Sequence, residues 1–126
     1  MLEAVRPTAV PAPSGPYSPG LKVGNLLFLA GQGPFNAEGE RVGVTFKDQM
    51  RQTLDNLEAV ANEAGTSLKN AVRIGGFLST LNFFDEYNEV IADYMGDNLP
   101  ARTTVPVALR GMDVEIDAVV LIPDTK

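Results

Sequence analysis

Three residues in the last quarter of the chain, Arg102, Thr104 and Asp117, combine a cation, a hydroxyl and a carboxylate. A guanidinium binds a carboxylate through two parallel hydrogen bonds, which fixes the orientation of an anionic ligand as well as its charge. A desolvated carboxylate can accept a proton from a water molecule and direct that water at a substrate. These residue types therefore suit chemistry on a small organic anion. Without a ligand the arginine and the carboxylate would form an interfacial salt bridge, and spacing alone favours neither interpretation.

The composition narrows the possible chemistry. The 126 residues include no Cys, His or Trp, which excludes disulfides, thiolate and imidazole nucleophiles and the usual zinc ligand sets. Sixteen acidic and ten basic residues give a net charge of −6, so nucleic acid is disfavoured as the principal partner. No apolar run approaches the roughly 20 residues of a membrane span. We expect one domain over residues 1–126, located in the cytoplasm, with no metal and no membrane partner.

Two amphipathic helices are predicted. Thr45 with Asp48 resembles a capping box, and the helix that follows is expected to end at Gly65. Asn82 with Asp85 is expected to cap a second helix that ends at Gly96. The predicted apolar stripes are Phe46, Met50, Leu54, Leu57, Ala61 and Ala64 on the first helix and Phe84, Tyr87, Ile91 and Tyr94 on the second.

Apolar runs predict strands at residues 26–30, 71–78, 103–107 and 114–122. Five prolines between residues 7 and 19 exclude a helix or a central strand there, so the N-terminal arm is expected to be extended. The element order ββ-α-β-α-ββ indicates an α+β sandwich with antiparallel strands and both helices on one face. Pro106 predicts an edge position or a bulge for its strand.

The last predicted strand is apolar on both faces. Ile116, Ala118 and Val120 point one way, while Val119 and Leu121 point the other. Two helices cover only one face of a sheet, so the second face needs cover of its own. We expect a closed homo-oligomer, with the alternative that the N-terminal arm folds over the sheet.

A hairpin between the last two strands would bring the three chemical residues together. A symmetric turn over residues 108–113 places Thr104 opposite Asp117, and Arg102 lies on the same side of its strand as Thr104. A slip of one residue would turn Asp117 to the other face. Glu115 lies two residues earlier on Asp117's face and is interpreted as a solvated charge.

Five segments resemble, in order and spacing, the signature segments of the RidA/YjgF family: Ser14–Ser18, Phe28–Gln32, Arg51–Leu57, Pro100–Thr103 and Val114–Ala118. The resemblance covers nearly the whole chain. It implies a chorismate-mutase-like two-layer sandwich, with a mostly antiparallel sheet and two helices on one face. It also implies a homotrimer with sites in the clefts between subunits, and cofactor-independent hydrolysis of 2-imino or enamine acids to 2-keto acids and ammonia.

The family's binding residues match this sequence well at three positions. By resemblance, Arg102 binds the substrate carboxylate, Tyr17 closes the cleft, and the backbone of Gly31 lines it. From the residues alone, Tyr17 could instead pack at an interface, and Gly31 could serve a turn with positive φ. Asn88 matches a family asparagine on the second helix, where a solvent-facing or helix-packing amide is the alternative.

Three other positions depart from the family pattern. The glutamate that positions the attacking water falls on Asp117, one methylene shorter. Thr104 occupies a position often held by cysteine and can form hydrogen bonds, but it is no thiolate nucleophile. Ala30 replaces a serine. These departures keep alternatives open: a binding or sensing protein for small carboxylates or keto acids, or a deaminase of a larger enamine.

Overall fold

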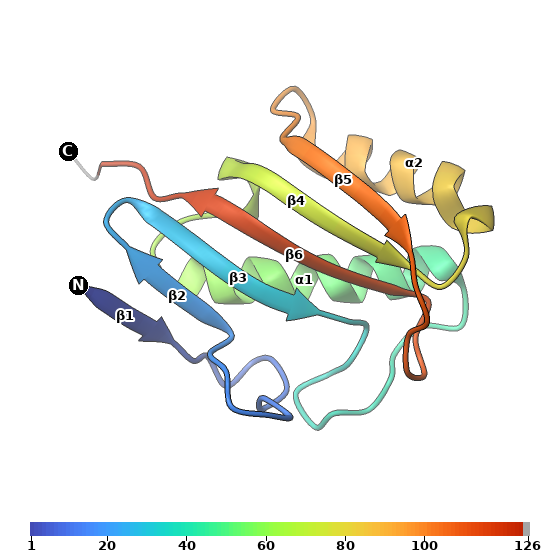
Figure 1. Cartoon of the computed structure of the whole chain (residues 1–126), viewed down its shortest axis with the longest axis horizontal. Helices are drawn as coiled ribbons and strands as arrows, with labels where there is room; N and C mark the ends of the chain where they lie inside the picture. The colour runs from blue at the N-terminus through green and yellow to red at the C-terminus, as the bar shows by residue number, and fades with distance from the viewer. Residues whose placement is uncertain (125–126) are drawn as a thin grey trace.

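The computed structural model describes residues 1–124 and contains a six-stranded sheet with two α-helices (Figure 1). The strands are β1 (Leu2–Val5), β2 (Gly20–Val23), β3 (Leu26–Gln32), β4 (Ala71–Leu78), β5 (Ala101–Pro106) and β6 (Val114–Leu121). The helices are α1 (Phe46–Glu63) and α2 (Phe84–Met95), and the short 3₁₀ turns are η1 (Leu68–Asn70) and η2 (Leu81–Phe83). The α+β prediction is confirmed.

The predicted helix signals are confirmed at three of the four helix ends. The Thr45 side chain accepts a hydrogen bond of 3.1 Å from the backbone N–H of Asp48, and Gly65 follows α1 with a φ of 88°. Gly96 ends α2 with a φ of 63°. Asn82 does not cap α2, because the turn η2 intervenes and Phe83 precedes the helix without a side-chain cap. Within residues 1–124, neither helix is long and apolar enough to cross a membrane.

The strand order is β1-β2-β3-β6-β4-β5, so the predicted hairpin of β5 and β6 is wrong. The connection through α2 brings β5 beside β4 in parallel, and β6 fills the position between β3 and β4. The other neighbouring strands pair antiparallel. As Pro106 predicts, β5 lies at an edge of the sheet. The first strand, β1, was not predicted and precedes the prolines of the arm.

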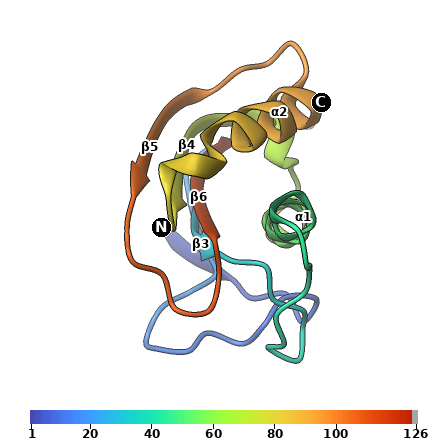
Figure 2. The same cartoon turned by 90° about the vertical axis from the view of Figure 1, so that its right-hand side faces the viewer.

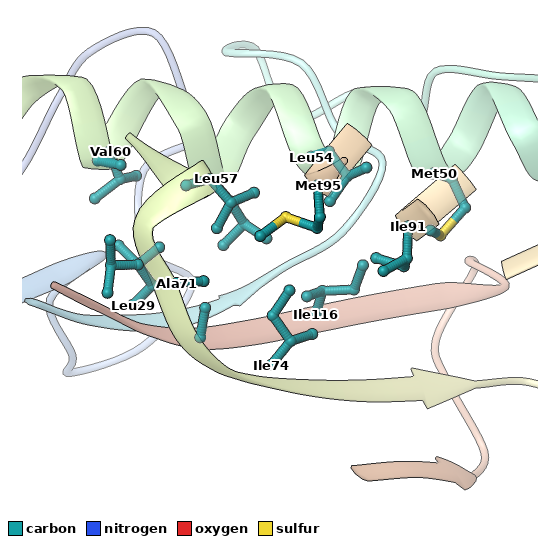
Figure 3. Packing of buried hydrophobic residues seen from close by; sticks show 14 of the residues in the cluster. Leu29, Met50, Leu54, Leu57, Val60, Ala71, Ile74, Ile91, Met95 and Ile116 are labelled. Carbon is teal, nitrogen blue, oxygen red and sulfur yellow. The ribbon is translucent and has the colours of Figure 1, made fainter. Parts of the chain in front are cut away.

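The core lies between the sheet and the helices. Figure 2 shows both helices on the same side of the strands. Figure 3 shows side chains of α1 and α2 in contact with side chains of the sheet. The buried residues labelled there are Leu29, Met50, Leu54, Leu57, Val60, Ala71, Ile74, Ile91, Met95 and Ile116. We call the sheet face away from the helices the open face.

The open face carries exposed apolar side chains, as the two-sided strands predict. Phe28 is 43% exposed, Leu121 37% and Leu2 65%. The N-terminal arm does not cover them, because β1 pairs with β2 at the sheet edge and Val10 is buried in the core. The alternative of a folded-over arm is therefore wrong. Within the single chain, this apolar face is uncovered.

Candidate functional site

Arg102 lies on the helix side of the edge strand β5. Its register partner on β4 is Ile74, a core residue, so the side chain points towards α2. The guanidinium carbon lies 5.5 Å from the ring centre of Phe84 and 5.1 Å from that of Tyr87. Such cation–π contacts hold a guanidinium by its face. Arg102 forms no hydrogen bond or ion pair with any residue from 1 to 124, so its N–H donors remain free for an anionic ligand.

Three polar atoms on α2 and β5 are buried without a hydrogen-bond partner within residues 1–124. They are the hydroxyl oxygens of Tyr87 and Thr104 and the amide oxygen of Asn88, the residue after Tyr87. Gly76 makes room for the Tyr87 hydroxyl, since a Cβ there would overlap it. Burial raises the pKa of Tyr87, while the Arg102 charge and the Thr104 hydroxyl oppose the rise. We call Arg102, Thr104, Tyr87 and Asn88 the Arg102 cluster.

Asp117 lies on the opposite face of the sheet from Arg102 and Thr104, which corrects the predicted trio. In register, Asp117 faces Gly75 on β4, and Gly75 faces Thr103 on β5. The prediction failed because inserting β4 between β5 and β6 changes which residues share a face. The Asp117 carboxylate lies against Gly75, beside Arg73 and a small cavity of about 180 Å³. Thr103, rather than Thr104, lines that cavity.

Glu115 is the carboxylate that lies against Gly31. A bulge in β3 interrupts its pairing with β6 between Leu29 and Gln32, and a Cβ on Gly31 would overlap the Glu115 carboxyl group. Glycine at position 31 therefore allows the Glu115 carboxyl group to approach the backbone closely. Its φ is not positive, so it does not serve a turn of that kind. Glu115 is half-buried, so its interpretation as a solvated charge is wrong. Burial, with a smaller contribution from the Asp117 charge, raises the pKa of Glu115.

Tyr17 lines a cleft of about 570 Å³ beside the end of β3. Its hydroxyl accepts a long hydrogen bond of 3.4 Å from the backbone N–H of Ser14. Ala30, next to Gly31, donates its backbone N–H to the carbonyl of Pro19 at 3.0 Å, which joins the end of the arm to β3. Tyr17 is exposed, so its hydroxyl can reach a ligand in the cleft.

The comparisons with known proteins agree over nearly the whole chain. A family model described as Endoribonuclease L-PSP matches residues 7–122. The chain belongs to the RidA/YjgF family. A RutC family protein of Pyrococcus horikoshii is 42% identical, covering 94% of this chain and 97% of its own.

Solved structures of the RidA/YjgF family share the fold. RidA from an Antarctic Psychrobacter species is 33% identical, with a TM-score of 0.89, and the match covers 95% of this chain and 99% of that one. The YjgF gene product from E. coli is 31% identical, with a TM-score of 0.86, and the match covers 94% of this chain and 98% of that one.

In this RidA/YjgF chain the candidate residues form two groups that do not meet. The Arg102 cluster lies on the helix side at β5, whereas Gly31 and Glu115 lie on β3 and β6. Only β4 lies between Glu115 on β6 and Arg102 on β5, which corresponds to roughly 10 Å across the sheet. Glu115 shares the face of Asp117, whereas Arg102 lies on the helix side, so this chain does not join the two residues in one site.

Sequence reasoning named Glu115 and Tyr87 but gave neither a role in the site. Alternate residues of a strand share a face, so Glu115 and Asp117 could not be distinguished, and only the register of β3 against β6 places Glu115 against Gly31. Tyr87 was assigned to the helix stripe, and nothing in that stripe indicates that its hydroxyl lies beside Thr104.

Proposed function

We propose that the protein hydrolyses small 2-imino or enamine acids, of the 2-aminoacrylate or 2-iminobutyrate type, to 2-keto acids and ammonia without a cofactor. The observation that carries the proposal is the guanidinium of Arg102, held by two aromatic rings with its donors free. That arrangement suits bidentate binding of the substrate carboxylate. Membership of the RidA/YjgF family is consistent with it.

The proposed reaction assigns the water to Glu115 instead of Asp117. Water adds to the imine carbon, its O–H proton passes to Glu115, and the C=N electron pair moves to nitrogen. The proton then passes from Glu115 to nitrogen, which gives a carbinolamine. The second proton of the water leaves the carbinolamine hydroxyl for Glu115 and passes on to nitrogen, the C–N bond breaks as C=O forms, and ammonia leaves. The raised pKa of Glu115 suits a group that takes up a proton and returns it. Because an imine is already electrophilic, positioning and proton transfer suffice.

The proposal includes a homotrimer with sites between subunits. Two observations support an assembly of copies: the exposed apolar residues of the open face, and the separation of the Arg102 cluster from Glu115 within one chain. In the proposed trimer one subunit supplies Arg102, and its neighbour supplies Gly31, Glu115 and Tyr17. Sedimentation equilibrium at micromolar concentration tests this, and the mass of a single chain would contradict it.

The function is tested by generating 2-aminoacrylate or 2-iminobutyrate in situ and following release of the keto acid. The wild type should accelerate release above buffer, and Arg102→Ala should lose most of the acceleration. The matched control is Arg51→Ala, an exposed arginine on α1 that is paired with Asp48. If the wild type does not exceed buffer, the proposal is wrong for these substrates.

A binding protein for small carboxylates or keto acids is the second candidate. It is favoured by the Arg102 cluster itself, which has a cation and hydroxyl groups but, within residues 1–124, no carboxylate that could position water. Calorimetry that detects keto-acid binding, lost in Arg102→Ala, together with no acceleration of hydrolysis, would select this function. The family model's name refers to an endoribonuclease, but the net charge of −6 and the absence of histidine give RNA cleavage little physical support.

A further inference from the structure

Apart from Tyr17, the residues that line the cleft beside Tyr17 have no role in the proposed reaction. The cleft lies between the N-terminal arm, the end of β3 and the loop that joins β5 to β6, and its volume is about 570 Å³. The apolar part of the lining includes Phe35 and Met112, and the polar part includes Ser14, Gln32 and Arg110. We call this the Arg110 cleft.

Two buried amides of α1 hold the walls of this cleft. Asn56 donates hydrogen bonds to the carbonyl of Gly33 at 3.1 Å and to that of Phe35 at 2.7 Å, which fixes the wall after β3. Gln49 donates to the Asp113 carboxylate at 3.0 Å and accepts from the Asp113 N–H at 3.0 Å, which fixes the end of the loop that carries Arg110. The cleft is thus formed before any ligand binds.

The charge of the cleft is opposite to that of the whole protein. Arg110 is exposed and forms no ion pair within the described part of the chain, and no Asp or Glu is among the residues that line the cleft. Gln32 lines the cleft and is 8% exposed; its amide forms no side-chain hydrogen bond within residues 1–124 and is not among the polar atoms that are cut off from solvent. Its amide can therefore form a hydrogen bond with a ligand in the cleft. The guanidinium and the amide together fit a carboxylate.

The cleft begins one residue after Gly31 on β3, since Gln32 and Gly33 line it while Gly31 and Glu115 do not. Gly31 lies against Glu115, and two residues along β3 Gly33 lies against Met112, whose sulfur would be 2.6 Å from a Cβ at that position. Two residues of a strand span about 7 Å. A substrate whose imine carbon lies at Glu115 can therefore extend a side chain of two or three carbon atoms into the cleft.

We infer that the preferred ligand is dicarboxylic, a 2-imino or 2-keto acid of five or so carbons whose distal carboxylate binds Arg110 and Gln32. The inference rests on the proposed function for the position of the 2-imino carboxylate at Arg102. Binding of the distal carboxylate at Arg110 does not depend on turnover.

The test is calorimetric titration with 2-oxoglutarate and with 2-oxobutyrate, which differ in the distal carboxylate. The wild type should bind 2-oxoglutarate at least about tenfold more tightly, as expected for a charge-assisted pair. Arg110→Gln should remove this preference and leave the affinity for 2-oxobutyrate unchanged. Arg51→Gln removes the same charge at a distance from the cleft and should keep the preference.

Equal affinities in the wild type, a preference that persists in Arg110→Gln, or binding of neither acid would each overturn the inference. The proposed function fails separately. If the preference depends on Arg110 but no imine is hydrolysed faster than in buffer, the dicarboxylate site stands and the deaminase activity does not. If 2-iminobutyrate is hydrolysed but the two keto acids bind equally, the activity stands and the dicarboxylate site does not.

Discussion

Arg102 and Arg110 are two of the five arginines that form no ion pair within residues 1–124, and the protein holds these two in different ways. The faces of Phe84 and Tyr87 hold Arg102 itself, so its orientation is fixed while its donors stay free. Arg110 is held only through its backbone, because Gln49 anchors the loop at Asp113. The arrangement at Arg102 suits recognition of a ligand group that always occupies the same position. The side chain of Arg110 can still change its conformation, which suits the end of a ligand whose length varies.

The proposed function gives binding to the two cations and catalysis to Glu115, and the largest expected effect tests the catalytic role. Glu115→Gln should lower kcat for imine hydrolysis by about 100-fold or more, since general acid–base catalysis contributes roughly 10²- to 10⁴-fold. Asp117→Asn is the matched control and should change kcat only slightly. Single-turnover keto-acid release measures both, and a larger loss in Asp117→Asn would return the catalytic role to Asp117.

The two arginines should differ for a monocarboxylic substrate. Arg102→Ala should lower kcat/KM for 2-iminobutyrate by about 100-fold, because two charge-assisted hydrogen bonds are lost. Arg110→Gln should leave this value unchanged. Steady-state kinetics on both variants checks the difference. If kcat/KM falls by similar factors in the two variants, the two arginines do not have the different roles proposed for them.

The anchoring of the cleft can be weakened without touching either cation. Asn56→Ala leaves the buried carbonyls of Gly33 and Phe35 without their donor and should lower the free energy of unfolding by about 1–3 kcal/mol. Gln52→Ala removes a neighbour that donates to Asn56 but keeps both anchoring bonds, so its effect should be smaller. Urea denaturation measures both, and equal losses would show that the two carbonyl bonds contribute little.

The aromatic support of Arg102 should have a modest effect on binding. Phe84→Leu should weaken binding of 2-oxobutyrate by about two- to fivefold, the size of one partly exposed cation–π contact. Phe83→Leu is the control, since Phe83 stacks on Phe46 and not on Arg102. Calorimetry distinguishes them, and unchanged binding in Phe84→Leu would mean that the ring does not position the guanidinium.

The smallest expected effect concerns pH. If Glu115 acts as the carboxylate, kcat/KM should fall on acidification at a pH above the ordinary glutamate range, because the pKa of Glu115 is raised. Asp117→Asn removes the like charge and should move this acid limb to lower pH. Rate profiles of the wild type and the variant measure the shift, and a movement to higher pH would contradict it.

Local signals predicted much of the fold because they act within a few residues. Thr45 caps α1, glycines follow both helices, and Pro106 marks the edge strand. The apolar residues on both faces of β6 correctly predicted an uncovered sheet face. What failed was long-range pairing, since no local feature of residues 103–122 indicates that β4 lies between β5 and β6.

The site followed the same division. Arg102, Tyr17 and Gly31 were recognised from their segments, and each lies where a ligand could reach it or where backbone approaches closely. The carboxylate was assigned to Asp117 because a hairpin of the last two strands would place it opposite Thr104 and because the family's glutamate falls on that position. The hairpin is wrong, and the contact of Glu115 with Gly31 depends on the β3 bulge, which one sequence does not reveal.

The two consecutive glycines of β4, Gly75 and Gly76, leave that strand without side chains on either face at that point. Gly75 admits the Asp117 carboxylate on one side, and Gly76 admits the Tyr87 hydroxyl on the other. With no side chain at either position, only backbone separates the two groups. Burial is the main cause of the raised pKa of Tyr87, and the Asp117 charge adds a small contribution from the other face. At these two glycines the sheet is thin enough for a charge on one face to act on a hydroxyl on the other.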